Sequence, residues 1–117
     1  MTSKDRREEL RSTYEQRPRE AGVYVLRNSA TGRILIASTV DLASIRNRLE
    51  FGQSTHSTGV LDRRLVADAR AHGMESFSLE VLDTLPADPE RDDAQAAADL
   101  KALEELWRDQ LADQPQY

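Results

Sequence analysis

The sequence contains no cysteine. This absence excludes a disulfide framework, a catalytic thiol and any zinc or iron–sulfur site held by cysteine. A chain of 117 residues can still bury enough surface to hold a core without such cross-links. Because a cysteine-free composition suits a reducing compartment, we expect a cytoplasmic protein.

Long apolar runs are also missing. Hydrophobic residues make up 38% of the chain and charged residues 32%, and no segment is apolar over the length needed to cross a bilayer. The stretch from Met1 to Arg7 is charged and no apolar stretch follows it, which is not the pattern of a signal peptide. We therefore expect no membrane partner.

The charge is unevenly distributed along the chain. The net charge of −5 argues against a general nucleic-acid binder. However, ten acidic and only three basic residues lie in residues 81–117, whereas all seven basic residues of 21–80 are arginines. The composition therefore permits a basic surface in the part of the chain before residue 81.

The spacing of apolar residues predicts a single α/β domain over 1–117. Apolar residues alternate at Phe77, Leu79 and Val81, as in a strand with one buried face. The expected strands are 22–28, 33–38 and 76–83, and the expected helices are 4–16, 40–51, 60–72 and 94–112. They form a small three-stranded, mainly antiparallel sheet flanked by helices.

Several finer expectations follow from the same pattern. Leu42, Ile45 and Leu49 share one helix face, so we expect Ile45 to be buried. Gly52 is expected to end that helix. Residues 1–20 form an N-terminal helical extension, and residues 113–117 form a frayed tail.

Several short segments, taken in order, resemble the GIY-YIG nuclease domain. The resemblance covers about residues 21–111, and it rests on the ordered set of motifs rather than on any one of them. The segments are Gly22-Val23-Tyr24, Leu35-Ile36-Ala37, Ser38-Thr39-Val40-Asp41-Leu42, Asp62-x-x-Leu65, His72-Gly73, Glu75-Ser76-Phe77-Ser78-Leu79-Glu80-Val81-Leu82 and Leu103-Glu104-Glu105-Leu106-Trp107.

The resemblance implies hydrolysis of a DNA phosphodiester with one divalent metal, magnesium or manganese. It gives Tyr24 a role in activating the attacking water and makes Glu104 the metal ligand. An arginine and a second tyrosine would hold the phosphate, whose charge such groups and a metal stabilise. Each residue also has a simpler interpretation. Tyr24 is then a packed strand tyrosine, and Glu104 is a helix glutamate that pairs with Arg108 at i,i+4.

The phosphate-holding half of this site is replaced. Leu35 stands at the second tyrosine, Ala37 at the second glycine, and Ile45 at the arginine. Arg46 is the neighbouring candidate, although one residue turns a helical side chain by about 100°. His56 lies in the loop where some relatives carry a site histidine. The candidate catalytic residues are therefore Tyr24, Arg46 and His56.

Two functions follow from this mixture of matches and replacements. The first is a divergent nuclease-like protein with weak or absent phosphodiester hydrolysis, a DNA-processing role, and magnesium or manganese as cofactor if it is active. The second is an inactive module without a cofactor that binds nucleic acid or a protein partner, including a second copy of itself.

Overall fold

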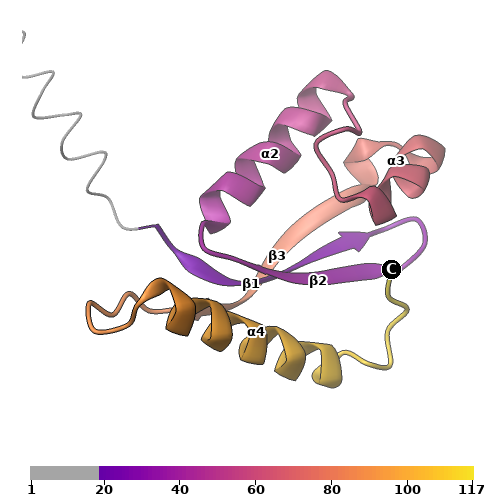
Figure 1. The fold of residues 1–117 in the computed structure, drawn as a ribbon. Helices are drawn as coiled ribbons and strands as arrows, with labels where there is room; N and C mark the ends of the chain where they lie inside the picture. Colours follow the sequence, from indigo (N-terminus) through magenta and orange to yellow (C-terminus); the bar gives the residue numbers. More distant parts are fainter. Residues whose placement is uncertain (1–18) are drawn as a thin grey trace, which may run out of the picture.

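The computed structural model describes residues 19–117, so the helix expected over 4–16 lies outside the described residues. Within residues 19–117, three strands and three helices follow one another, with two short 3-10 turns before and after the second of these helices (Figure 1). The elements are β1 (Ala21–Asn28), β2 (Ile34–Thr39), α2 (Leu42–Thr55), η1 (Arg63–Leu65), α3 (Val66–His72), η2 (Met74–Ser76), β3 (Phe77–Leu85) and α4 (Asp93–Gln110).

The sheet is antiparallel throughout, with strand order β2-β1-β3, and this confirms the expected α/β class with three strands. β1 and β2 form a hairpin whose turn is stabilised by Asn28. The Asn28 side-chain oxygen accepts hydrogen bonds from the backbone N–H groups of Ala30 (2.8 Å) and Thr31 (3.3 Å). Gly32 then adopts a φ of 76°, which glycine accommodates without strain.

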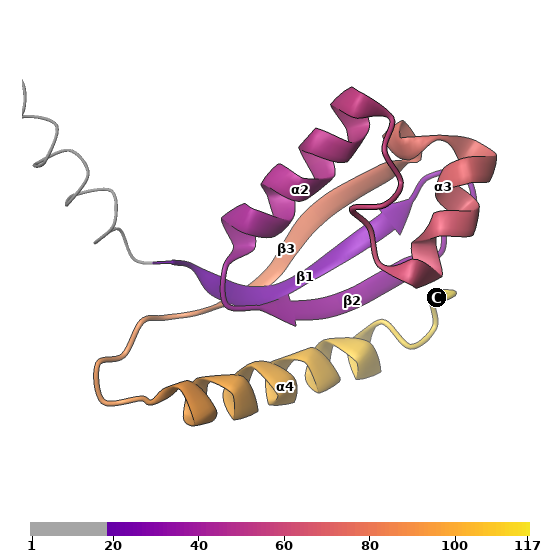
Figure 2. The same ribbon diagram turned by 45° about the horizontal axis from the view of Figure 1, so that its top comes forward.

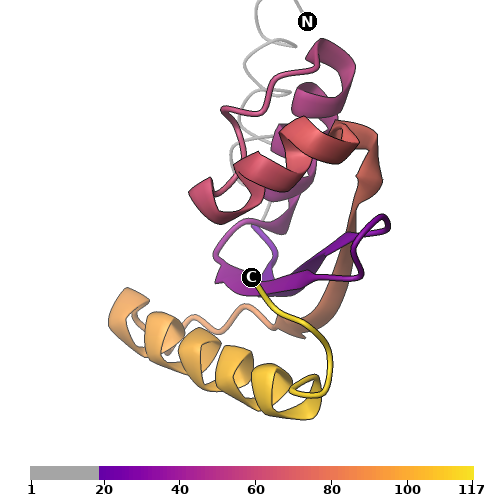
Figure 3. The same cartoon turned by 90° about the vertical axis from the view of Figure 1, so that its right-hand side faces the viewer.

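The helices form layers on both faces of the sheet. Helices α2 and α3 lie on one face and α4 lies on the other (Figures 2 and 3). The central strand β1 feeds both layers, because successive side chains of a strand point to opposite faces. Tyr24 and Leu26 belong to the cluster that includes the α2 residues Leu42 and Leu49. Val23 and Val25 belong to the cluster packed against α4.

A β-bulge interrupts the pairing of β1 with β3. Val23 pairs with Asp83, but the next residue, Tyr24, pairs with Val81. The extra residue, Leu82, packs towards α4, and Asp83 accepts a hydrogen bond from the Trp107 indole N–H at 3.3 Å. The bulge thus turns two successive β3 residues towards α4. Trp107 is half-buried rather than fully enclosed.

The structure corrects three expectations about the helices. Helix α2 continues through Gly52 to Thr55. Gly52 allows close packing instead of ending the helix, because a side chain there would collide with Val60 and Met74. The helix expected over 60–72 is the short turn η1 followed by α3. Ile45 is half-buried, since it packs against the core cluster and also lines a cavity.

The expected frayed tail is also wrong. The Ile34 N–H donates to the Pro115 carbonyl (2.8 Å), and the Tyr117 N–H donates to the Ile34 carbonyl (3.0 Å). The Tyr117 hydroxyl donates to an Asp68 carboxylate oxygen at 2.7 Å, and the Arg33 guanidinium lies 4.3 Å from the centre of the Tyr117 ring. The tail therefore adds backbone hydrogen bonds to the outer edge of β2. Among residues 19–117, no helix is long and apolar enough to span a bilayer.

We predict that Gly22→Ala destabilises the fold by about 1–3 kcal/mol. A Cβ at Gly22 would collide with the Asp83 carbonyl oxygen and would lie 3.0 Å from the Leu42 side chain. Gly59→Ala is the matched control, because a Cβ there has no neighbour within 4 Å. Urea unfolding of both variants measures the difference, and equal midpoints would show that the close approach at Gly22 is unimportant.

Candidate functional site

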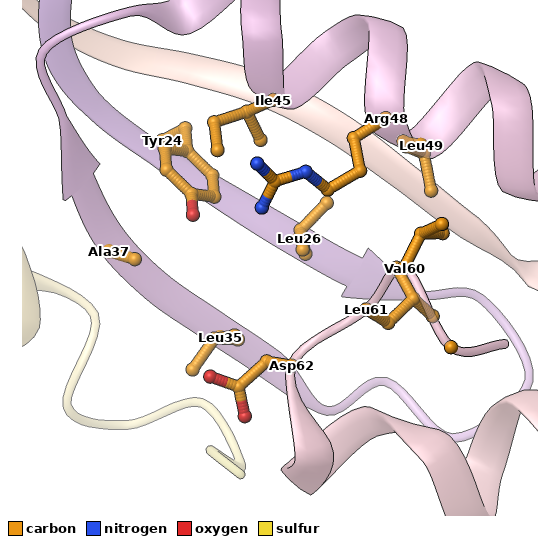
Figure 4. Close-up of a pocket in the computed structure, with 11 residues that line it drawn as sticks. Tyr24, Leu26, Leu35, Ala37, Ile45, Arg48, Leu49, Val60, Leu61 and Asp62 are labelled. Carbon is orange, nitrogen blue, oxygen red and sulfur yellow. The ribbon is translucent and has the colours of Figure 1, made fainter.

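A cavity of about 340 Å³ opens between α2, the β1–β2 hairpin and the loop before η1 (Figure 4). We call it the central cleft. Most of the residues that line it are apolar, and three side chains, Tyr24, Arg48 and Asp62, bring polar groups to it. The residues that line it are Tyr24, Leu26, Leu35, Ala37, Ile45, Arg48, Leu49, Gly59, Val60, Leu61 and Asp62.

Tyr24 projects from the central strand into this cleft (Figure 4). Its side chain is 8% exposed, and its hydroxyl makes no hydrogen bond to another residue in the described part of the chain. Burial raises the pKa of the Tyr24 hydroxyl above its usual value. The positive charge of Arg48 opposes this rise, and the carboxylates of Asp62 and Glu104 add to it. At neutral pH, Tyr24 therefore presents a protonated hydroxyl that can donate a hydrogen bond.

Arg48 provides the cation of the central cleft, whereas Arg46 does not line it. Arg48 lies three residues after Ile45, so the two side chains share one face of α2. Figure 4 shows the Arg48 guanidinium and the Ile45 side chain on the same side of the cleft as Tyr24. Arg46 and Arg48 are both exposed, but Arg46, two residues earlier on the helix, does not line the cleft. The Arg48 guanidinium thus enters the cleft from about one helical turn after Ile45, which stands where the GIY-YIG family has its arginine.

His56 is not brought to the central cleft either. It is exposed at the end of α2, where it adopts a left-handed conformation with a φ of 55°. Its backbone N–H donates to the Gly52 carbonyl, which closes the helix. The residues that line the loop side of the cleft are instead Gly59, Val60, Leu61 and Asp62.

Asp62 is paired with Arg64 at the rim of the central cleft. One Asp62 oxygen accepts from the Arg64 backbone N–H and from Arg64 Nε, both at 2.9 Å, and the other accepts from Arg64 Nη2 at 3.1 Å. The side-chain hydrogen bonds from Arg64 lower the pKa of Asp62 to about 2. The sequence shows Arg64 as one of seven arginines in residues 21–80. The spacing of an aspartate and an arginine two residues apart at a helix start was the available signal.

Glu104 lies on α4, on the other side of the sheet, and reaches the outer edge of β2. Its Oε1 accepts from the Ser38 hydroxyl at 3.3 Å, and its Oε2 lies 3.2 Å from Arg108 Nη2. The same Arg108 nitrogen also donates to the Ile36 carbonyl at 3.3 Å. The i,i+4 ion pair that was the alternative interpretation of Glu104 is therefore present, and it is anchored to the edge strand.

The donors around Glu104 do not fit a metal centre built by the protein. Magnesium, which the family resemblance implies, takes about six oxygen ligands in near-octahedral order. Both Glu104 oxygens have protein partners, and Asp62 is held by Arg64. Within residues 19–117, no group of three or more histidine, cysteine, aspartate or glutamate side chains could hold a metal ion.

Comparison with known proteins supports the fold. No protein-family model matches the sequence, and no curated protein matches it. A variant of the catalytic domain of the intron endonuclease I-TevI is similar in structure, with a TM-score of 0.56, 15% identity, and coverage of 80% of this chain and 84% of that one. A second structure, of the catalytic domain of the homing endonuclease I-TevI, has a TM-score of 0.53, 18% identity, and coverage of 79% and 88%.

The chain has the GIY-YIG nuclease fold. The identity to both structures is low, so the likeness establishes the arrangement of the elements and leaves the chemistry to the residues of this chain. In this fold, the central cleft keeps Tyr24 but has Leu35, Ala37 and Ile45 in its wall.

We predict that Arg64→Gln raises the pKa of Asp62 from about 2 towards the usual aspartate value of about 3.9. A lowered carboxyl pKa means that the ionised form is favoured in the folded state. The pairing therefore stabilises the folded protein above the pKa that Asp62 has in the unfolded chain, and this stabilisation is lost as the pH falls towards 2. NMR titration of the side-chain carboxyl measures the pKa directly. Arg63→Gln is the control and should move it much less, and an ordinary pKa in the unaltered protein would contradict the pairing.

Proposed function

We propose that this protein binds the phosphate backbone of DNA in the central cleft and hydrolyses it weakly or not at all. The observation that carries the proposal is the pairing of two donors, the Arg48 guanidinium and the neutral Tyr24 hydroxyl, in one cleft. Phosphate oxygens accept hydrogen bonds from both groups, and an arginine–phosphate contact is charge-assisted. The structural neighbours are endonuclease domains, which makes DNA the nucleic acid to test.

The proposed weakness of hydrolysis follows from three features of the site. First, the raised pKa of Tyr24 makes its hydroxyl a poor general base at neutral pH. Second, Leu35 and Ile45 supply neither a phenol nor a charge where a transition state would need stabilisation. Third, Glu104 is held by Ser38 and Arg108, so binding a magnesium or manganese ion would require breaking those contacts.

A protein partner or a second copy of this chain is the alternative function. In the part of the chain that the structure describes, the large exposed apolar side chains are Val40, Phe51 and Leu106, which lie in the β2–α2 connection, on α2 and on α4. Single exposed apolar residues on separate elements are ordinary for a protein surface. No specific observation therefore favours this alternative over DNA.

The test is a DNA-binding titration of the full chain at low and at physiological salt. We expect weak, strongly salt-dependent binding, because the acidic residues of 81–117 oppose it and the contacts come from a few arginines. Arg48→Gln should weaken binding about 10- to 150-fold, as the loss of one charge-assisted hydrogen bond does. It should also reduce the salt slope by about 0.7 to 0.9.

Arg46→Gln is the matched control, because it removes the same charge from the same helix outside the central cleft. A much smaller effect of Arg46→Gln supports a site at Arg48. Equal effects of the two variants would show that the protein attracts DNA through its general charge alone. Efficient cleavage with magnesium or manganese that disappears in Glu104→Ala would contradict the proposed weak hydrolysis.

A further inference from the structure

A second cavity of about 220 Å³ lies along the outer edge of β2, and we call it the edge cavity. Two arginines from separate elements, Arg64 of η1 and Arg108 of α4, meet at its wall. The C-terminal segment closes one part of the wall and is itself hydrogen-bonded to β2. The residues that line this cavity are Ile34, Leu35, Ile36, Arg64, Arg108, Gln116 and Tyr117.

Both guanidinium groups are fixed in position but retain donors. Arg64 uses Nε and Nη2 for Asp62, and Arg108 uses Nη2 for Glu104 and the Ile36 carbonyl. Among residues 19–117, Arg64 Nη1 and the Nε and Nη1 of Arg108 make no hydrogen bond. The two side chains are 51% and 45% exposed, so these donors are accessible to a ligand. A guanidinium that is already oriented by a partner loses less entropy when it binds an anion.

The edge cavity adjoins the central cleft. Leu35 lines both cavities, and the Asp62–Arg64 pair spans them, since Asp62 lines the central cleft and Arg64 lines the edge cavity. Arg64 and Glu104 also act electrostatically on Tyr24, which agrees with this proximity. Three arginines, Arg48, Arg64 and Arg108, thus follow one another around β2 from the central cleft to its outer edge.

We propose that the edge cavity binds a second phosphate of the same DNA strand, adjacent to the phosphate held by Tyr24 and Arg48. This inference rests on the proposed function and adds the path of the strand, which crosses β2 over Leu35. The ligand is a strand with at least two phosphodiesters. One phosphate contacts Arg48 in the central cleft, and the next contacts Arg64 and Arg108 in the edge cavity. A strand so bound is recognised through its backbone and not through its bases.

The test compares two probes, a dinucleoside monophosphate and a trinucleoside diphosphate, by NMR titration at low salt. We expect the unaltered protein to bind the diphosphate about tenfold more tightly than the monophosphate, which corresponds to about 1.4 kcal/mol. The double variant Glu104→Gln/Arg108→Gln removes the edge arginine without changing the net charge. It should reduce the preference to about the twofold statistical advantage of a second phosphate.

Two further variants control for stability and for charge. Asp62→Asn/Arg64→Gln removes the other edge arginine, also without a change in net charge, and tests the inference if loss of the Arg108 contact to β2 prevents folding. Arg91→Gln/Asp99→Asn removes an ion pair of 3.1 Å that lies outside both cavities, and it should keep the tenfold preference of about 1.4 kcal/mol.

The outcomes separate the inference from the proposed function. If both edge variants keep the diphosphate preference while Arg48→Gln weakens the monophosphate, the edge cavity is no phosphate site and the proposed function stands. If the unaltered protein binds neither probe, both are wrong. Inorganic phosphate is the remaining arm of the test. Saturation of the edge cavity by inorganic phosphate as tightly as by the diphosphate would assign the site to the free anion and overturn the inference of a bound strand.

Discussion

Burial of β1 on both faces is the constraint on which the rest of the structure depends. β1 is the central strand. Its even-numbered residues pack on the side of α2, and its odd-numbered residues pack on the side of α4. Val23 and Val25 are fully buried towards α4, so Tyr24 must point towards α2. The bulge opposite Tyr24 and the close approach at Gly22 belong to the same arrangement. The placement of Tyr24 in a cleft is thus a consequence of packing as well as of any function.

The free edge of β2 accounts for the chemistry of the site. An edge strand exposes backbone groups that need partners. Arg108 satisfies the Ile36 carbonyl, and the C-terminal segment pairs with Ile34. Because Arg108 also holds Glu104, the glutamate is drawn into the support of the edge. The result is a surface on which guanidinium groups lie beside carboxylates.

The sequence predicted the fold because its signals were local and repeated. Alternation at Phe77, Leu79 and Val81 is a property of a single element, and it predicted the third strand, which the structure has at Phe77–Leu85. Gly52 was misread because a glycine that serves close packing resembles one that ends a helix. The docking of Tyr117 depends on Asp68 and Arg33, which are distant in sequence, so no local pattern indicated it.

The candidate site was less predictable for the same reason. Tyr24 and Glu104 could be named from the resemblance, but which arginine reaches the cleft depends on the rotation of α2 about its axis. That rotation places Ile45 and Arg48 on the cleft side and Arg46 away from it. The pairing of Glu104 with Arg108 follows from helical spacing, whereas its contact with Ser38 depends on how α4 crosses the edge of β2.

We infer that Glu104 supports the outer edge of β2 through Arg108 and is not poised to bind a metal. Calorimetric titration of the protein with manganese tests it most directly, with Glu105→Ala as the control for a neighbouring carboxylate on the same helix. We expect binding no tighter than about millimolar, as a single engaged carboxylate allows, in the unaltered protein and in both glutamate variants. Micromolar binding that is lost in Glu104→Ala and kept in Glu105→Ala would contradict it.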